Sequence, residues 1–205
     1  MSASPVAFRW ALVIALSVTF PLAFGALDDV WLATHLDAPP QMADNYFGPQ
    51  LKLSAEAQRD VYLAGQSGMS SAIANMAPAR IVVSVLLAIS AFSVVVLLFR
   101  LRFTASVELA QWLSRAATAT AVLRTLSGAQ NLVIARRMAG AFGEALEAQK
   151  LPPEMSDTSA LIMAAVSTAS VVWSLLIVGC FLGLAAYFRS EGLRELLTRA
   201  ARETE

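Results

Sequence analysis

The stretch TATAVLRTLSGAQNLVIARR, residues 118–137, decides the fold because it is apolar enough to enter a bilayer but carries Arg124 near its middle. A central arginine costs about 2.5–3.5 kcal/mol on insertion scales. The apolar residues around it together return about 2–4 kcal/mol; they are Leu113, Val122, Leu123, Leu126, Leu132, Val133 and Ile134. Insertion is therefore close to balanced, and it requires help from neighbouring helices.

The competing interpretation of this stretch is an amphipathic helix that lies on the membrane surface. At 100° per residue, one face collects the polar residues Glu108, Gln111, Arg115, Arg137 and Glu144. Arg124 and Asn131 fall on the opposite, more apolar face. This imperfect amphipathicity favours a helix that crosses the membrane.

The composition indicates a membrane protein. Of the 205 residues, 57% are hydrophobic and only 15% are charged, whereas ordinary soluble domains carry about 25% charged residues. We therefore expect an all-α, multi-pass transmembrane bundle that forms one integral membrane domain over residues 1–205. The formal net charge of zero gives no reason to expect a nucleic-acid partner. The excess of arginine over lysine, 13 against two, is typical of a GC-rich bacterial genome and suggests the bacterial inner membrane.

Three spans stand out by their lack of charge, near residues 9–27, 80–99 and 164–187. The second is the strongest, because the uncharged residues 81–99 are bracketed by Arg80 and Arg100. The third lies within an uncharged run over 158–188, which is longer than one straight crossing needs. An alternative for residues 1–25 is a cleaved signal peptide, for which Ala23 and Gly25 offer a small-x-small site.

The distribution of basic residues favours a fourth span near 113–135. With three spans, eight basic residues would lie inside and seven outside, which is a poor asymmetry. With four spans, the tail 189–205 returns to the cytoplasm, together with Arg9 and the Arg100/Arg102 pair. Arg136, Arg137 and Lys150 would then lie outside and count against this topology. We prefer four spans with both termini cytoplasmic, and three spans is the alternative.

The longest connection is expected to be an outer loop, residues 28–79, with helical segments. A short helix should end before Pro39 and Pro40, and another should begin after Ser54 as its N-cap. Gly65 and Gly68 make that second helix breakable. The loop is interpreted as a solvated cap over the bundle, or else as a docking surface for another envelope protein.

Catalytic chemistry is hard to find in this sequence. It has no HExxH, GxSxG, Walker or CxxC motif. His35 is the only histidine, and the scattered aspartates near it are a weak basis for a metal site. Cys180 is interpreted as a small packing residue. We therefore expect no catalytic, metal or cofactor-binding residues and a non-enzymatic role.

Two features are candidates for function. Arg124 is a candidate intramembrane functional charge, with Glu108, Gln130, Asn131 or a lipid phosphate as its partner; the alternative is an arginine close enough to the interface to need no special role. Gly179 and Gly183 are candidates for close helix packing, within the bundle or between two copies.

These observations predict an accessory or scaffold protein that packs with membrane partners. Besides the lipid bilayer, its partner would be another membrane protein or a second copy of itself. The alternative is a small transporter or channel component that uses Arg124. A transporter should have a polar cavity converging on Arg124, whereas a scaffold should have a dry, closed bundle.

Overall fold

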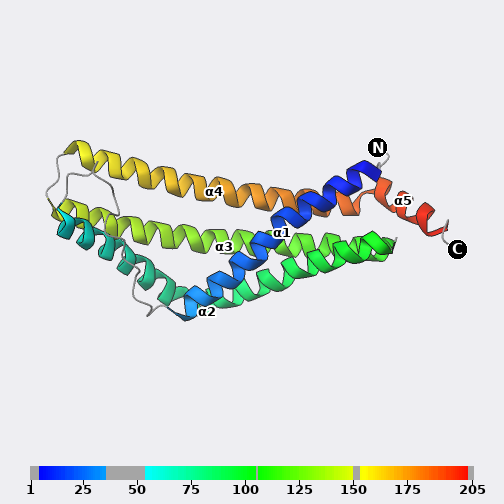
Figure 1. The fold of residues 1–205 in the computed structure, drawn as a ribbon, viewed down its shortest axis with the longest axis horizontal. Coiled ribbons are helices and arrows are strands. Elements are labelled where there is room, and N and C mark those ends of the chain that lie inside the picture. Colours follow the sequence, from blue (N-terminus) through cyan, green and yellow to red (C-terminus); the bar gives the residue numbers. More distant parts are fainter. Residues whose placement is uncertain (1–4, 36–53, 105, 150–152, 203–205) are drawn as a thin grey trace. The chain divides into compact units, whose positions relative to one another are not determined.

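The computed structural model describes residues 5–35, 54–104, 106–149 and 153–202 of the chain. This part is folded as five helices and contains no strand, so the all-α prediction is confirmed. The helices are α1 (Pro5–Thr34), α2 (Ala55–Phe103), α3 (Val107–Ala148), α4 (Pro153–Arg189) and α5 (Glu191–Arg202) (Figure 1).

The helices begin where the sequence offers a suitable N-terminal residue. The Oγ of Ser54 accepts a hydrogen bond from the backbone N–H of Ala57 at 3.2 Å, which confirms the predicted N-cap. The Oγ of Ser106 accepts one from the N–H of Leu109 at 3.4 Å at the start of α3. Helix α4 starts at Pro153, in the first turn, where proline is tolerated because its missing N–H would have no partner there.

Two parts of the predicted outer loop belong to the long helices. Residues 28–34 continue α1, and residues 55–79 form the first half of α2, which runs through Pro78 into the apolar segment. Neither Gly65 nor Gly68 interrupts α2. The expected stop at Pro39 and Pro40 lies outside the described residues.

Three of the described helices are long and apolar enough to cross a membrane, in the ranges Ala15–Thr34, Glu56–Phe103 and Ser167–Arg189. Helix α3 has the length, at 42 residues, but is not among those that also meet the apolar requirement. Helix α2 has 49 residues, which extend over about 74 Å, whereas the hydrocarbon core of a bilayer is about 30 Å thick. A large part of α2 must therefore lie outside any bilayer that it crosses without a steep tilt.

The chain divides into two compact units, each of which takes part of α2, α3 and α4. The first unit contains Met1–Val30, Ile81–Ser127 and Trp173–Glu205, and the second contains Trp31–Arg80 and Gly128–Val172. The first unit takes 26 residues of α1, 23 of α2, 21 of α3 and 17 of α4. Each of these segments is close to the length of about 20 residues that one crossing requires.

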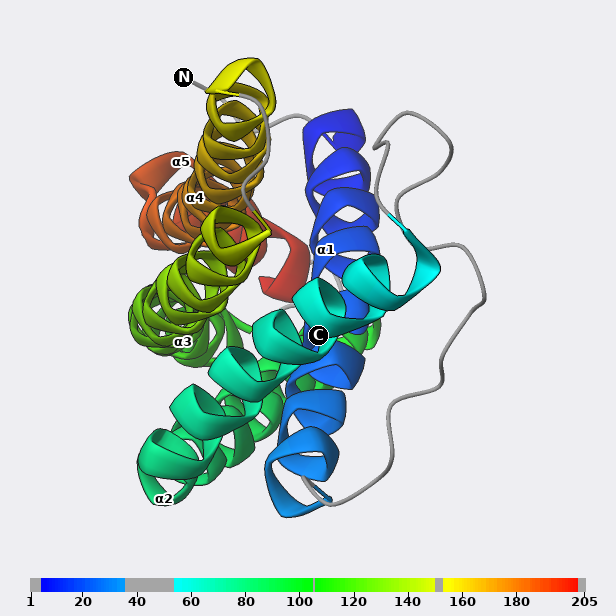
Figure 2. The ribbon, with the colours of Figure 1, turned by 90° about the vertical axis from the view of Figure 1, so that its left-hand side faces the viewer.

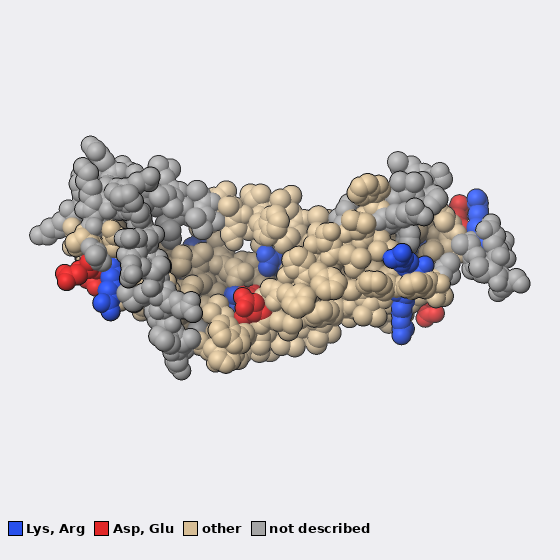
Figure 3. Space-filling model, in the orientation of Figure 1, with Lys and Arg blue, Asp and Glu red and all other residues tan. Residues whose placement is uncertain are grey.

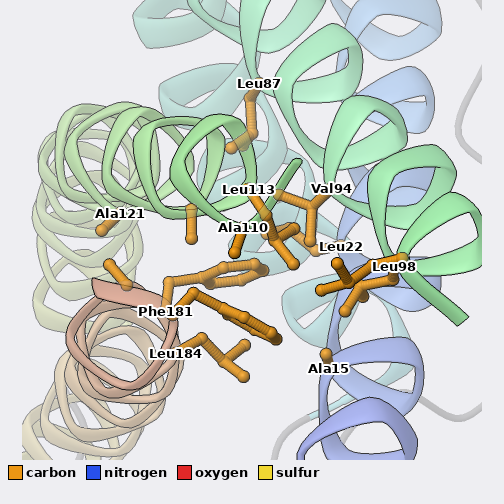
Figure 4. Close-up of a cluster of buried hydrophobic side chains, with 14 of the residues drawn as sticks. Ala15, Leu22, Leu87, Val94, Leu98, Ala110, Leu113, Ala121, Phe181 and Leu184 are labelled. Carbon is orange, nitrogen blue, oxygen red and sulfur yellow. The ribbon is translucent and has the colours of Figure 1, made fainter. Parts of the chain in front are cut away.

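The first unit has a continuous apolar core to which all five helices contribute. Figure 4 shows side chains from different helices converging, with Phe181 of α4 directed toward Ala110 and Leu113 of α3. Leu22 of α1 and Leu98 of α2 belong to the same cluster. Leu113 and Ala117 of α3 are fully buried in this cluster, so α3 is as much a part of the core as the three more apolar helices.

Hydroxyl groups join the helices of the first unit. The hydroxyl of Thr120 in α3 donates to the Oγ of Ser90 in α2 at 3.1 Å, and the hydroxyl of Ser114 in α3 donates to the carbonyl of Ala185 in α4 at 2.9 Å. In this unit α3 lies between α2 and α4, as both ribbon views show (Figures 1 and 2). Each of these bonds satisfies a polar group that would be costly to bury unpaired.

Helix α5 packs onto the first unit. Its Leu193 and Leu197 are buried and belong to the apolar core cluster. This helix lies in the predicted tail 189–205 and covers the core with its apolar face.

The second unit is organised around a close approach of α2 and α3. A Cβ added at Gly68 would lie 2.7 Å from the Cβ of Ala141 and 2.9 Å from the carbonyl oxygen of Arg137. Only glycine fits at this distance. Val61 and Ile73 are buried in the same unit, so the glycine predicted to weaken α2 is the point where α2 meets α3.

Candidate functional site

Arg124 lies in the first unit, on the part of α3 that faces α4. Its side chain is partly buried, and its Nη2 donates a long hydrogen bond to the Oγ of Ser174 in α4 at 3.4 Å. Asp29, near the end of α1, is the acidic residue whose charge acts on Arg124. The Nε of Arg124 is buried and has no hydrogen-bond partner among the described residues. The guanidinium is therefore only partly satisfied by the chain.

The position of Arg124 along the bundle, relative to the uncharged segment of α2, follows from the contacts of its own helix α3. Thr120 bonds Ser90, which is the middle residue of the uncharged segment 81–99 of α2. Arg124 follows Thr120 by one helical turn, which is about 6 Å along the axis. It therefore lies level with the uncharged part of α2, about 6 Å along the axis from the level of Ser90.

The partners predicted for Arg124 differ from those observed. Its hydrogen bond goes to Ser174, and not to Glu108, Gln130 or Asn131. Glu108 lies in the first turn of α3, four turns away. Asn131 accepts a hydrogen bond from another arginine. Ser174 belongs to α4, and Asp29, whose charge acts on Arg124, belongs to α1; the pattern of a single helix does not report either residue.

Arg80 is the polar residue that the sequence analysis missed as a candidate. It is buried in the second unit, with only 4% of its surface exposed. Its Nη1 donates to the Oδ1 of Asn131 at 2.7 Å, a short, charge-assisted hydrogen bond between α2 and α3. In the sequence, Arg80 looks like the charged end of the second span. The feature that could have indicated its partner is Asn131, a polar residue in an otherwise apolar stretch.

The glycines predicted to mediate packing do not meet another helix among the described residues. A Cβ at Gly179 or at Gly183 would have no heavy atom within 4 Å in the described structure. Both glycines are exposed, on a face of α4 that also exposes Leu175, Leu176 and Leu182. Packing of these glycines inside the monomer is therefore not observed, and packing against a partner stays a prediction.

The remaining candidates form ordinary local interactions. The Nδ1 of His35 lies 3.0 Å from the carbonyl oxygen of Trp31, and the two rings stack with centroids 5.0 Å apart. Cys180 is a free thiol and partly buried. Within the described ranges, no three histidine, cysteine, aspartate or glutamate side chains gather where they could hold a metal ion. Asp37 and Asp44, the other residues considered near His35, lie outside those ranges.

The fold fits the class of multi-pass helical membrane proteins, on the basis of three long apolar helices and a first unit with helix segments of membrane-spanning length. No protein-family model matches the chain, and comparisons with curated proteins and with solved structures find no significant match. Function therefore has to be argued from the residues themselves.

Proposed function

We propose that this protein is a non-enzymatic accessory or scaffold protein of the bacterial inner membrane, with four spans and both termini on the cytoplasmic side. Its first unit is the membrane-embedded bundle. Its partners are other membrane proteins or a second copy of the chain. No cofactor is required for this role.

The observation that carries the fourth span is the hydrogen bond between Thr120 and Ser90. Ser90 is at the centre of the strongest apolar segment, so a bilayer that contains this segment also surrounds Thr120 of α3. Thr120 is fully buried. Helix α3 is too polar to insert easily alone, but its Ser114 and Thr120 hydroxyls bond α4 and α2, as is usual for polar residues in multi-pass bundles.

The scaffold role is supported by the filled core and by the exposed face of α4. The described core cluster consists of apolar side chains from all the helices of the first unit, as expected for a closed bundle. The face with Gly179 and Gly183 is free of contacts within the described chain. Small residues on such a face permit close approach of another transmembrane helix.

The topology is tested with paired reporters fused after Glu205, one active only in the cytoplasm and one only outside. A cytoplasmic signal, with residues 10–27 retained, means an even number of crossings and supports the proposal. An external signal means an odd number and would remove α3 from the membrane.

The scaffold role is tested with a photo-crosslinking residue at Gly179 in native membranes. A matched probe replaces Phe181, which is fully buried in the core. The proposal predicts a discrete cross-linked protein or dimer from position 179 and none from position 181. Cross-links to lipid alone from position 179 would contradict it.

A transporter role is the second candidate, because Arg124 is a charged group level with the uncharged segment of α2, and the charge of Asp29 acts on it. Replacing Arg124 with leucine separates the two roles. Loss of a solute flux in the Arg124→Leu variant would favour transport, whereas unchanged or improved insertion, with any flux preserved, favours the scaffold.

A further inference from the structure

Arginine and aromatic side chains gather at the end of the first unit that contains the α2–α3 connection and α5. The described basic residues at this end are Arg100, Arg102, Arg115, Arg189, Arg194 and Arg199, against the acidic Glu108, Glu191 and Glu195. In Figure 3 the outer surface of this unit is mostly uncharged, and blue side chains project near this end. The excess of positive charge therefore borders an apolar surface.

Arg115 differs from the other arginines of this group because it belongs to α3 and lies two turns inside that helix. It follows Ser114, which bonds α4, and precedes Thr120, which bonds the middle of the apolar segment of α2. Thr120 is five positions after Arg115, which corresponds to about 7.5 Å along the helix axis. The backbone of the exposed Arg115 therefore lies level with the uncharged segment 81–99 of α2. At this level inside a bilayer, water cannot satisfy a guanidinium.

The side chain of Arg115 is directed toward the charged end of the unit. Its guanidinium carbon lies 5.0 Å from the ring centre of Trp112, which is about one turn closer to the α2–α3 connection. Trp112 is itself 51% exposed. A long basic side chain that runs along a tryptophan toward the membrane surface has the geometry of snorkelling, and tryptophan is enriched at the headgroup level.

We infer that Arg115 and Trp112 form a binding site for the headgroup phosphate of an anionic phospholipid. Arg100, Arg102 and Arg189 strengthen the positive potential around it. A lipid is favoured over an acidic protein because the last turns of α2, at the same end of the unit, expose the apolar side chains of Val96, Phe99 and Phe103. The inference rests on the four-span topology of the proposed function.

The test measures quenching of Trp112 fluorescence in vesicles that contain brominated lipids. Trp10, Trp31 and Trp173 are all exposed and are replaced with phenylalanine, which leaves Trp112 as the only tryptophan of the full chain. Brominated phosphatidylglycerol and brominated phosphatidylcholine are compared. We expect the anionic lipid to associate near Trp112 about fivefold more strongly, and this preference should weaken as salt is added.

Three variants make the result specific. Arg115→Leu should abolish most of the preference, whereas Arg115→Lys should retain it because the charge stays. Arg136→Leu is the matched control, since Arg136 is an exposed arginine of α3 in the second unit, and it should leave the preference unchanged.

The outcomes separate this inference from the topology on which it rests. Quenching by neither lipid would place Trp112 outside the bilayer and remove the four-span proposal. Equal quenching by both lipids, or a preference that survives in Arg115→Leu, would overturn the phosphate site while the topology stands.

Discussion

Asp29 of α1 is the acidic residue whose charge acts on Arg124 of α3 in the first unit. Replacing Asp29 with asparagine removes the compensating charge and should destabilise the protein by about 1 kcal/mol, since the pair is partly exposed. Thermal unfolding in detergent would measure this loss. Asp28→Asn, at the neighbouring exposed position, is the control and should have little effect.

A double variant distinguishes the pair from a general effect of Asp29. In the Arg124→Leu background, Asp29→Asn should cost much less than it does in the native chain, because the charge that it balances is gone. Equal costs in both backgrounds would show that Asp29 acts through some other contact.

Asn131 accepts a hydrogen bond from the buried Arg80. Asn131→Leu should destabilise the second unit by about 1–3 kcal/mol, because the guanidinium loses a charge-assisted acceptor. Asn131→Asp should retain most of the stability, since its carboxylate can accept the same bond. Chemical unfolding checks both, with Gln130→Leu as the neighbouring control; a larger loss in the control would contradict this role of Asn131.

Gly68 marks the closest observed approach of α2 and α3. Gly68→Ala forces a Cβ to within 2.9 Å of a backbone oxygen, and overpacking of this kind costs about 1–3 kcal/mol. The same change at Gly140, where a Cβ would meet nothing within 4 Å, should be stabilising by about 0.5–1 kcal/mol because alanine favours helix. Melting temperatures that shift in the same direction for both variants would argue against the observed approach.

At the level of elements, α5 is held by Leu193 and Leu197. Replacing both with alanine should release α5 from the core, at a cost of about 2–5 kcal/mol for each leucine. Limited trypsin digestion of the purified protein should then cleave within α5 much faster. Leu196→Ala, at a less buried position of the same helix, is the control. Unchanged cleavage in the double variant would show that α5 is not anchored through these leucines.

The apolar helices could be predicted from the sequence because each contains a long uncharged segment. The start of α2 could also be predicted, since the N-cap chemistry of Ser54 is local. The helical segments expected before Pro39 and after Ser54 are present, and the structure joins them to the apolar segments within α1 and α2. Packing against another helix, as at Gly68, stabilises such a segment.

The candidate site was predictable only in part. Charge in an apolar stretch pointed to Arg124, but Ser174 and Asp29 lie on other helices, and their position depends on how the helices pack. The same reason explains why the interaction of Arg80 with Asn131, 51 residues apart in sequence, was not foreseen. Small-residue spacing suggested Gly179 and Gly183, yet spacing does not say whether a partner helix belongs to the same chain.

For the whole molecule, four spans place the two ends of α3 on opposite sides of the membrane. With Cys180 replaced by serine, single cysteines at Thr104 and at Gln149 report these two sides. A membrane-impermeant maleimide applied to intact cells should label position 149, and position 104 only after lysis. Labelling of both positions in the same condition would contradict a crossing by α3.

The hydrogen bonds from α3 to α4 have a consequence for biosynthesis. Ser114 and Arg124 bond residues of α4 that are 71 and 50 positions later in the chain. At about 5–20 residues per second, the ribosome needs roughly 3–14 s to make these partners after Ser114 and Arg124 have themselves been translated. During that delay, a nascent helix that is barely apolar enough to enter lipid would have to wait at the translocon, so insertion of α3 and α4 as a hairpin is the expected route.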